Sequence, residues 1–147
     1  MPSDSFMKLG NVIHRSLIKV SSGKRGWDMA GMPVLKLTTT GRKSGKSRTV
    51  MLTSPLQIEE GIVIVASKGG SEKHPDWFMN LQENPEAIVE TQSGRKAMVA
   101  KILDPDNREA RWNEIIQDFK NYDNYQNRTD RVIPLVILIP KNLSSSD

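Results

Sequence analysis

Residues 34–53 read VLKLTTTGRKSGKSRTVMLT, and this stretch predicts two strands, Val34–Thr38 and Thr49–Thr53, joined by a tight turn. The turn concentrates four cations: Arg42, Lys43, Lys46 and Arg48. Because no aspartate or glutamate occurs from residue 29 through residue 58, this cluster repels itself unless solvent or an anionic partner screens it. Guanidinium, ammonium and glycine N–H groups bind phosphates and carboxylates. The stretch therefore predicts a hairpin that binds an anion.

The length and composition predict one globular domain over residues 1–147, with 37% hydrophobic and 26% charged residues. The net charge of +4 and the pI near 9.4 favour anionic partners, but they do not choose among nucleotide cofactors, nucleic acids and lipid headgroups. There is no cysteine, and His14 and His74 are far apart, so neither a disulfide nor a metal site is expected. Without an apolar run of transmembrane length or a signal peptide, the expected location is the cytoplasm.

The domain is expected to have three parts: an N-terminal helix and loop at residues 1–26, a barrel core at 31–140 and a flexible tail at 141–147. Residues 5–20 place apolar side chains at roughly helical spacing, and basic side chains fill much of the rest. Two interpretations of this helix stay open. It packs on the barrel or on a partner subunit, or it touches the inner membrane surface. The sequence does not choose between a monomer and a homodimer.

The remainder of the chain predicts many strands and few helices. The expected elements are a strand at 61–66, a helix at 74–81, a hairpin at 87–91 and 96–102 that turns at Ser93-Gly94, a helix that opens at Asp104, and a last strand at 132–139. The apolar run at 61–66 predicts a strand that is buried on both faces. Pro134 marks an edge or a bulge in the last strand. Together these elements predict a mainly β, α+β domain, a small antiparallel barrel with flanking helices.

Several interpretations compete for the basic turn. A triphosphate-binding loop needs four residues between its first glycine and the Gly-Lys-Ser, whereas only three separate Gly41 from Gly45, so we reject that match. The charge would suit a nucleic acid, but no nucleic-acid signature is present and no such partner is expected. A solvated turn without a ligand is a third interpretation. The second polar junction, Ser67-Lys68-Gly69-Gly70 at a strand end, favours instead a long anionic ligand that touches both places.

These motifs, in this order, resemble the deazaflavin (F420)-dependent nitroreductase family of split β-barrel oxidoreductases. The resemblance covers residues 31–140 and rests on Thr39-Thr40-Gly41-Arg42-Lys43-Ser44-Gly45, Arg48-Thr49-Val50, Ala66-Ser67-Lys68-Gly69-Gly70, His74-Pro75, Trp77, Asn80-Leu81, Asn84-Pro85, Tyr122, Tyr125-Gln126, Thr129-Asp130-Arg131 and Ile133-Pro134. It implies a split β-barrel of the flavin- and deazaflavin-binding type. It also implies coenzyme F420 as the cofactor, whose phosphodiester and carboxylates match the unneutralised cations.

The resemblance further implies which residues form the site. The cofactor's phosphate and glutamate tail would be held by Arg42, Lys43, Ser44, Arg48, Thr49 and Val50. Its ring and linker would be lined by Val65, Ala66, Ser67 and Lys68, and covered by Asp76, Trp77, Phe78, Met79 and Asn80. Three hydroxyl residues are the catalytic candidates, as proton donors or as stabilisers of developing negative charge: Ser67, Tyr122 and Tyr125.

The implied activity is hydride transfer from reduced F420 to an electron-poor acceptor such as a quinone, an enone or a nitro compound. Thr53 and Arg128 stand where some nitro-reducing relatives carry aromatic residues, and Phe78 stands where tyrosine is usual. These departures make the substrate pocket less aromatic and more cationic, which favours quinone reduction. Two alternatives are an oxidoreductase that uses FMN in the same barrel and a non-catalytic F420-binding or carrier protein.

Overall fold

The computed structural model describes residues 28–29 and 31–141. Its elements in chain order are β1 (Asp28–Met29), β2 (Met32–Thr40), β3 (Ser47–Thr53), β4 (Leu56–Ile58), β5 (Gly61–Val65), the 3-10 helix η2 (Lys68–Gly70), α2 (Asp76–Glu83), β6 (Glu86–Thr91), β7 (Gly94–Ile102), α3 (Pro105–Asp118), α4 (Asn121–Gln126) and β8 (Leu135–Pro140). The predicted helix at 5–20 lies outside the described residues, as does all but the first residue of the predicted tail. No helix in the described ranges is long and apolar enough to cross a membrane.

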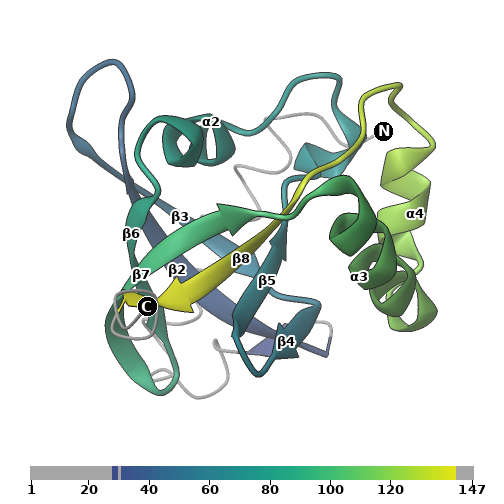
Figure 1. Ribbon diagram of the computed structural model, residues 1–147, viewed down its shortest axis with the longest axis horizontal. Helices are drawn as coiled ribbons and strands as arrows, with labels where there is room; N and C mark the ends of the chain where they lie inside the picture. Colours follow the sequence, from purple (N-terminus) through teal and green to yellow (C-terminus); the bar gives the residue numbers. More distant parts are fainter. Residues whose placement is uncertain (1–27, 30, 142–147) are drawn as a thin grey trace.

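The described strands form one curled antiparallel sheet. The strand order is β1-β2-β6-β7-β8-β5-β4, and β3 pairs with β2 beside this path. The β2–β3 ladder runs from Val34 opposite Thr53 to Thr40 opposite Ser47, which confirms the predicted hairpin. The sheet curls into a split barrel: α2 lies near the β2–β3 turn, and α3 and α4 lie beside each other next to β5 and β8 (Figure 1). The predicted fold class is confirmed.

Three local predictions need correction. The last strand begins at Leu135, and Pro134 precedes it, because the proline has no N–H for the ladder while its carbonyl accepts the N–H of Ala66 at 3.0 Å. This strand is central, between β7 and β5, and is not an edge. In the second hairpin Thr91 pairs with Gly94, so the turn residues are 92 and 93. The short strand β4 was not predicted from the sequence.

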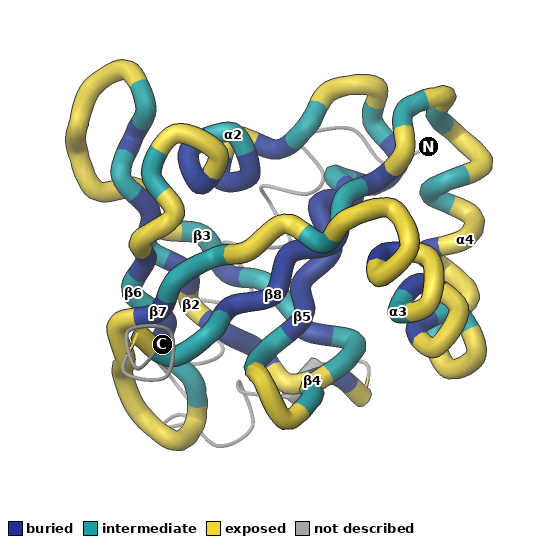
Figure 2. Tube along the Cα trace, in the orientation of Figure 1, coloured by how far each residue is buried: buried dark blue, intermediate teal, exposed yellow. Residues whose placement is uncertain are grey.

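Two hydrophobic clusters lie on opposite faces of β5 and β8. The cluster inside the barrel contains Ile64 from β5 and Leu138 from β8, whereas the cluster under α3 and α4 contains Val63 and Ile137. Successive side chains of a strand point to opposite faces, so both faces of these strands are covered. Figure 2 shows β5 and β8 as the most continuously buried part of the sheet. The prediction of a run buried on both faces is confirmed for residues 63–66, whereas Gly61 and Ile62 are half-buried.

The two helices outside the barrel are joined by one buried arginine, and α3 also begins at a capping carboxylate. The carboxylate of Asp104 accepts the backbone N–H of Asn107 at 2.8 Å and so begins α3. The guanidinium of Arg108 stacks over the Trp112 ring at 4.2 Å. It also donates to the Ile133 carbonyl at 3.1 Å and to the Gln126 side chain at 2.9 Å, and thereby joins α3, α4 and the segment before β8.

Candidate functional site

A cavity of about 700 Å³ lies between the β2–β3 turn, the end of β5 and the start of α2. Its lining comes from segments that are distant in the sequence: Thr39, Gly41, Arg42, Lys43, Ser44, Arg48, Thr49, Val50, Leu52, Val65, Ser67, Lys68, Pro75, Asp76, Trp77 and Asn80. Four of these residues are basic and one is acidic, whereas Val50, Leu52, Val65 and Trp77 supply an apolar wall. The cavity therefore combines an apolar surface with an electropositive rim.

The basic turn has an internally defined conformation. The N–H of Gly41 donates to the Lys46 carbonyl at 2.8 Å, and the N–H of Gly45 donates to the Gly41 carbonyl at 2.8 Å. A Cβ on Gly41 would lie 2.7 Å from Ser44 Oγ, so only glycine fits there without a shift. Ser44 Oγ accepts the Lys46 N–H at 3.2 Å and an N–H of Arg48 at 3.4 Å. These contacts hold the cations in place at the cavity rim.

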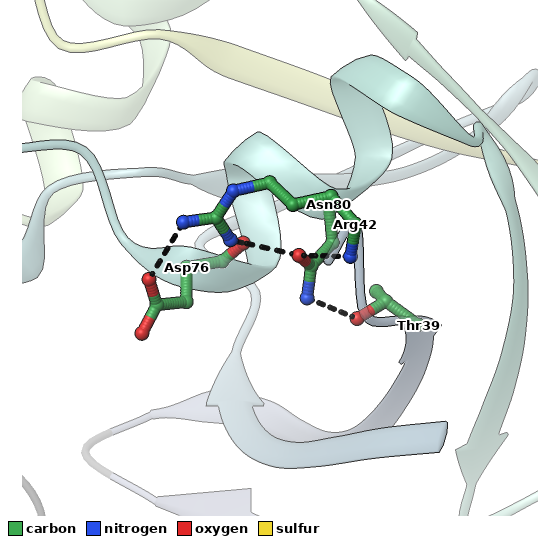
Figure 3. Close-up of polar contacts among 4 residues, drawn as sticks. All are labelled: Thr39, Arg42, Asp76 and Asn80. Carbon is green, nitrogen blue, oxygen red and sulfur yellow. Dashed lines mark hydrogen bonds and ion pairs between the residues drawn. The ribbon is translucent and has the colours of Figure 1, made fainter. Parts of the chain in front are cut away.

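A hydrogen-bond network joins the turn to α2 (Figure 3). The side-chain oxygen of Asn80 accepts both the backbone N–H of Arg42 at 3.2 Å and its guanidinium at 2.9 Å. The Asn80 amide nitrogen donates to Thr39 Oγ1 at 3.1 Å. The guanidinium also pairs with the exposed Asp76 carboxylate at 3.3 Å. Thr39 and Asn80 are each only 3% exposed, so this network is built into the structure and is not a surface contact.

The second polar junction follows β5 directly. Ser67 is 8% exposed and lines the cavity together with Lys68. Lys68 has a φ of 46°, the only positive φ of a non-glycine residue among those the structure describes. Such a conformation costs energy and persists only where neighbouring contacts hold it. The basic turn and the Ser67–Lys68 junction are thus brought to one cavity, as the sequence predicted.

The structure places the predicted cofactor residues in two groups. Twelve line the cavity: Arg42, Lys43, Ser44, Arg48, Thr49, Val50, Val65, Ser67, Lys68, Asp76, Trp77 and Asn80. Ala66 and Phe78 are buried in the cluster inside the barrel, and Met79 packs against that cluster, so these three do not line the cavity. The physical reason is periodicity, because neighbouring residues on a strand or helix point in different directions.

The two predicted catalytic tyrosines lie outside the cavity lining. Tyr122 is buried in the cluster under α3 and α4, with its hydroxyl 3.5 Å from Met32 Sδ. Burial raises the pKa of the Tyr122 phenol, and a hydrogen bond with Thr53 opposes that shift. Tyr125 stacks edge-on against Tyr122 with ring centroids 5.9 Å apart, and neither residue is part of the cavity lining. A proton-donor role for either tyrosine remains a prediction.

The predicted site residues left out four residues of the lining: Thr39, Gly41, Leu52 and Pro75. A signal for Thr39 exists, since Leu35, Leu37 and Thr39 alternate along β2 and are all buried. A period-two count would therefore have placed Thr39 on the inward face. Pro75 belongs to the His74-Pro75 motif of the family resemblance, which did not assign it to the site. It stands directly before α2, with extended backbone, and borders the cavity there.

The sequence model of the F420H(2)-dependent quinone reductases matches residues 12–140, which is most of the chain. The chain belongs to this family. The resemblance to deazaflavin-dependent reductases is thereby confirmed. Among similar proteins, the F420H(2)-dependent quinone reductase Rv1261c of Mycobacterium tuberculosis is 35% identical over 130 residues, which cover 86% of this chain and 87% of the relative.

Two solved structures are similar to this member of the F420H(2)-dependent quinone reductase family. One is described as an F420-H2 dependent reductase, FDR-A, with 38% identity, a TM-score of 0.61, and coverage of 72% of this chain and 93% of the other. The second is described as a domain-swapped dimer, with 33% identity, a TM-score of 0.66, and coverage of 86% and 96%. These likenesses support the split-barrel assignment.

Proposed function

We propose that this protein is an F420H2-dependent quinone reductase that binds its cofactor in the cavity between the basic turn, the Ser67–Lys68 junction and α2. The observation that carries the proposal is the lining of that cavity in a chain of this family. An electropositive rim continues into an apolar wall over about 700 Å³. An aromatic ring system with a long anionic tail is the ligand chemistry that this combination recognises.

The donor set of the rim fits the cofactor. Four cations, Arg42, Lys43, Arg48 and Lys68, would hold a phosphodiester and carboxylates, with Asp76 as the one acid among the lining residues. Trp77 and Val65 would pack against the ring system. FMN, the alternative cofactor, carries one phosphate and no carboxylate tail, so it would contact fewer of these cations. The donor set therefore favours F420.

When bound, the reduced deazaflavin ring supplies the hydride that an electron-poor acceptor takes up. The chain's own residues bind, orient and exclude water. The apolar wall of Val50, Leu52 and Trp77 keeps water from the ring side of the cavity. We assign the Ser67 hydroxyl and the Lys68 ammonium to stabilising the negative charge that develops on an acceptor oxygen. A quinone gains such charge on oxygen when it is reduced, which agrees with the family's activity.

The test is a titration of the purified protein with F420 and, separately, with FMN, followed by the intrinsic fluorescence of Trp77 and the other tryptophans. We expect saturable F420 binding and at most weak FMN binding. Oxidation of F420H2 by the protein should then accelerate on addition of menadione. Tight FMN binding without F420 binding would refute the cofactor assignment. F420H2 oxidation that menadione leaves unchanged would instead favour the non-catalytic carrier.

Oligomeric state and membrane contact are two finer proposals. The similar structure described as a domain-swapped dimer supports a homodimer of this chain, which light scattering during gel filtration would detect. The basic amphipathic pattern of residues 5–20 supports contact with an anionic membrane surface. Cosedimentation with phosphatidylglycerol vesicles, compared with phosphatidylcholine vesicles, would measure that contact. Equal recovery with both vesicle types would argue against it.

A further inference from the structure

We propose that Arg131 is a positioning residue for the cavity: its guanidinium holds the turn from Ala66 to Ser71 in the conformation that presents Ser67 and Lys68. Arg131 does not line the cavity itself. It lies between α4 and β8, about sixty positions after the turn that it contacts. The structural role of Arg131 is independent of the proposed function, and only the test that measures cofactor affinity rests on that function.

The guanidinium of Arg131 makes four hydrogen bonds to this turn and to the residues that follow it. Its Nε donates to the Ser71 carbonyl at 2.8 Å. One terminal nitrogen donates to the carbonyls of Ala66 at 3.2 Å and Ser67 at 2.9 Å. The other lies 3.0 Å from His74 Nδ1. Because arginine only donates, Nδ1 is the acceptor and the neutral ring carries its proton on Nε2. The planar guanidinium thus bonds both to the turn and to His74, which lies shortly before α2.

The turn needs an external clamp because its backbone is strained. Lys68 has a φ of 46°, and Gly69 and Gly70 follow with φ of 65° and 86°. Inside the turn, the N–H of Gly70 donates to the Ser67 carbonyl at 2.9 Å and the N–H of Ser71 to the Lys68 carbonyl at 3.1 Å. A left-handed lysine persists only where the surroundings hold it. Arg131 binds carbonyls on both sides of that residue.

The backbone of Arg131 is itself held by hydrogen bonds to nearby side chains. The Gln126 side chain donates to the Arg131 carbonyl at 2.7 Å, and Thr129 Oγ1 accepts the Arg131 N–H at 3.3 Å. Arg131 is half-buried, and burial lowers the pKa of its guanidinium, which remains charged. A shielded, charged donor makes stronger hydrogen bonds than one in water. The backbone of Arg131 is therefore held by the last residue of α4 and by Thr129, while its guanidinium holds the turn beside the cavity.

The first test uses the cofactor-free protein. Hydrogen exchange at the amides of Gly70 and Ser71 should be faster in Arg131→Lys than in the wild type, because an ammonium keeps the charge but cannot span four acceptors. Arg131→Gln is measured in parallel, so that the result does not depend on one variant folding. The matched control is Arg111→Lys, since Arg111 pairs with Glu114 at 2.8 Å on α3. Unchanged exchange in folded Arg131 variants would overturn the proposal.

The second test measures affinity for F420 by fluorescence. Arg131→Lys should weaken binding roughly tenfold, the equivalent of one charge-assisted hydrogen bond, while Arg111→Lys binds like the wild type. If Arg131 acts through the turn, its effect should shrink in a Ser67→Ala background. Full additivity of the two effects, or wild-type affinity in Arg131→Lys, would overturn the role. A wild type that fails to bind F420 refutes the proposed function instead, and hydrogen exchange still decides the clamp.

Discussion

Asn80 joins α2 to the basic turn through a single side-chain amide. Its oxygen accepts two hydrogen bonds from Arg42, and its nitrogen donates to Thr39, so three of its hydrogen-bonding positions are used within the protein. The family resemblance implied that Asn80 helps to cover the ring of the cofactor. The geometry assigns it a second task, which is to set the direction in which Arg42 leaves the turn. We therefore expect Asn80 to affect cofactor affinity through the position of Arg42.

Replacing Asn80 by alanine should destabilise the fold by about 1–3 kcal/mol, because it leaves Thr39 Oγ1 and the Arg42 N–H without these partners in a buried place. F420 affinity should fall as well. Asn84→Ala is the control, since it removes one exposed contact with the Glu86 N–H, 3.1 Å long. Urea unfolding and F420 titration measure both quantities. Equal losses in the two variants would show that the network has no special role.

His74 should make stability depend on pH. Burial, and then the Arg131 guanidinium, lower the pKa of His74 from its usual 6.5, so the folded chain resists protonation there. The stability that the neutral His74 contributes is therefore complete above the unfolded pKa and is lost as the pH falls from that value through the lower pKa of the folded state. The free energy of unfolding should decrease from pH 7.5 to pH 5.5, and less so in His74→Gln. His14→Gln, the other histidine, is the control, and an identical pH profile for His74→Gln and wild type would contradict the assignment.

At the scale of elements, β5 and β8 separate two environments. Their inward side chains pack inside the barrel, whereas their outward side chains lie under α3 and α4. α3 therefore stabilises the barrel from outside and contributes no residue to the cavity lining. Stability and cofactor binding should accordingly respond to different substitutions.

Ile115 in α3 provides the measurement at this scale. It is 1% exposed in the outer cluster, so Ile115→Ala should cost about 2–5 kcal/mol of unfolding free energy. Ile102→Ala in β7, at a residue that is 42% exposed, should cost far less, on the order of 0.5 kcal/mol. F420 affinity of folded Ile115→Ala should match the wild type. A large loss of affinity at temperatures where the variant is folded would show that α3 supports the cavity directly.

At the scale of the whole molecule, we expect the position of the cations to matter more for cofactor binding than the net charge of the chain. The chain carries +4, but the proposed cofactor contacts lie at one rim. Two adjacent cations, Arg95 and Lys96, stand instead on the exposed start of β7. Because screening weakens exposed charge interactions, cofactor affinity should fall as salt is added.

Replacing Arg42 and Lys43 by alanine should weaken F420 binding by at least about tenfold and flatten its salt dependence. Replacing Arg95 and Lys96 by alanine is the matched control, because it lowers the net charge of +4 by the same two units. Titrations at low and at high sodium chloride concentration give the comparison. Equal effects of the two double substitutions would mean that overall charge attracts the cofactor and that the turn has no specific contact with it.

The sequence by itself determined the two hairpins, the apolar strand at 61–66 and the basic turn, because strand alternation, glycine placement and unneutralised charge are local properties. Periodicity shows that a side chain faces a core but not which core it faces. Only the tertiary structure placed Tyr122 under α3 and α4, joined Asn80 to Thr39 across 41 positions and brought Arg131 to the Ser67 carbonyl. Such contacts depend on how the sheet curls and on which segments its curvature brings together. These contacts are therefore determined by the packing of the whole chain, and no single segment of the sequence predicts them.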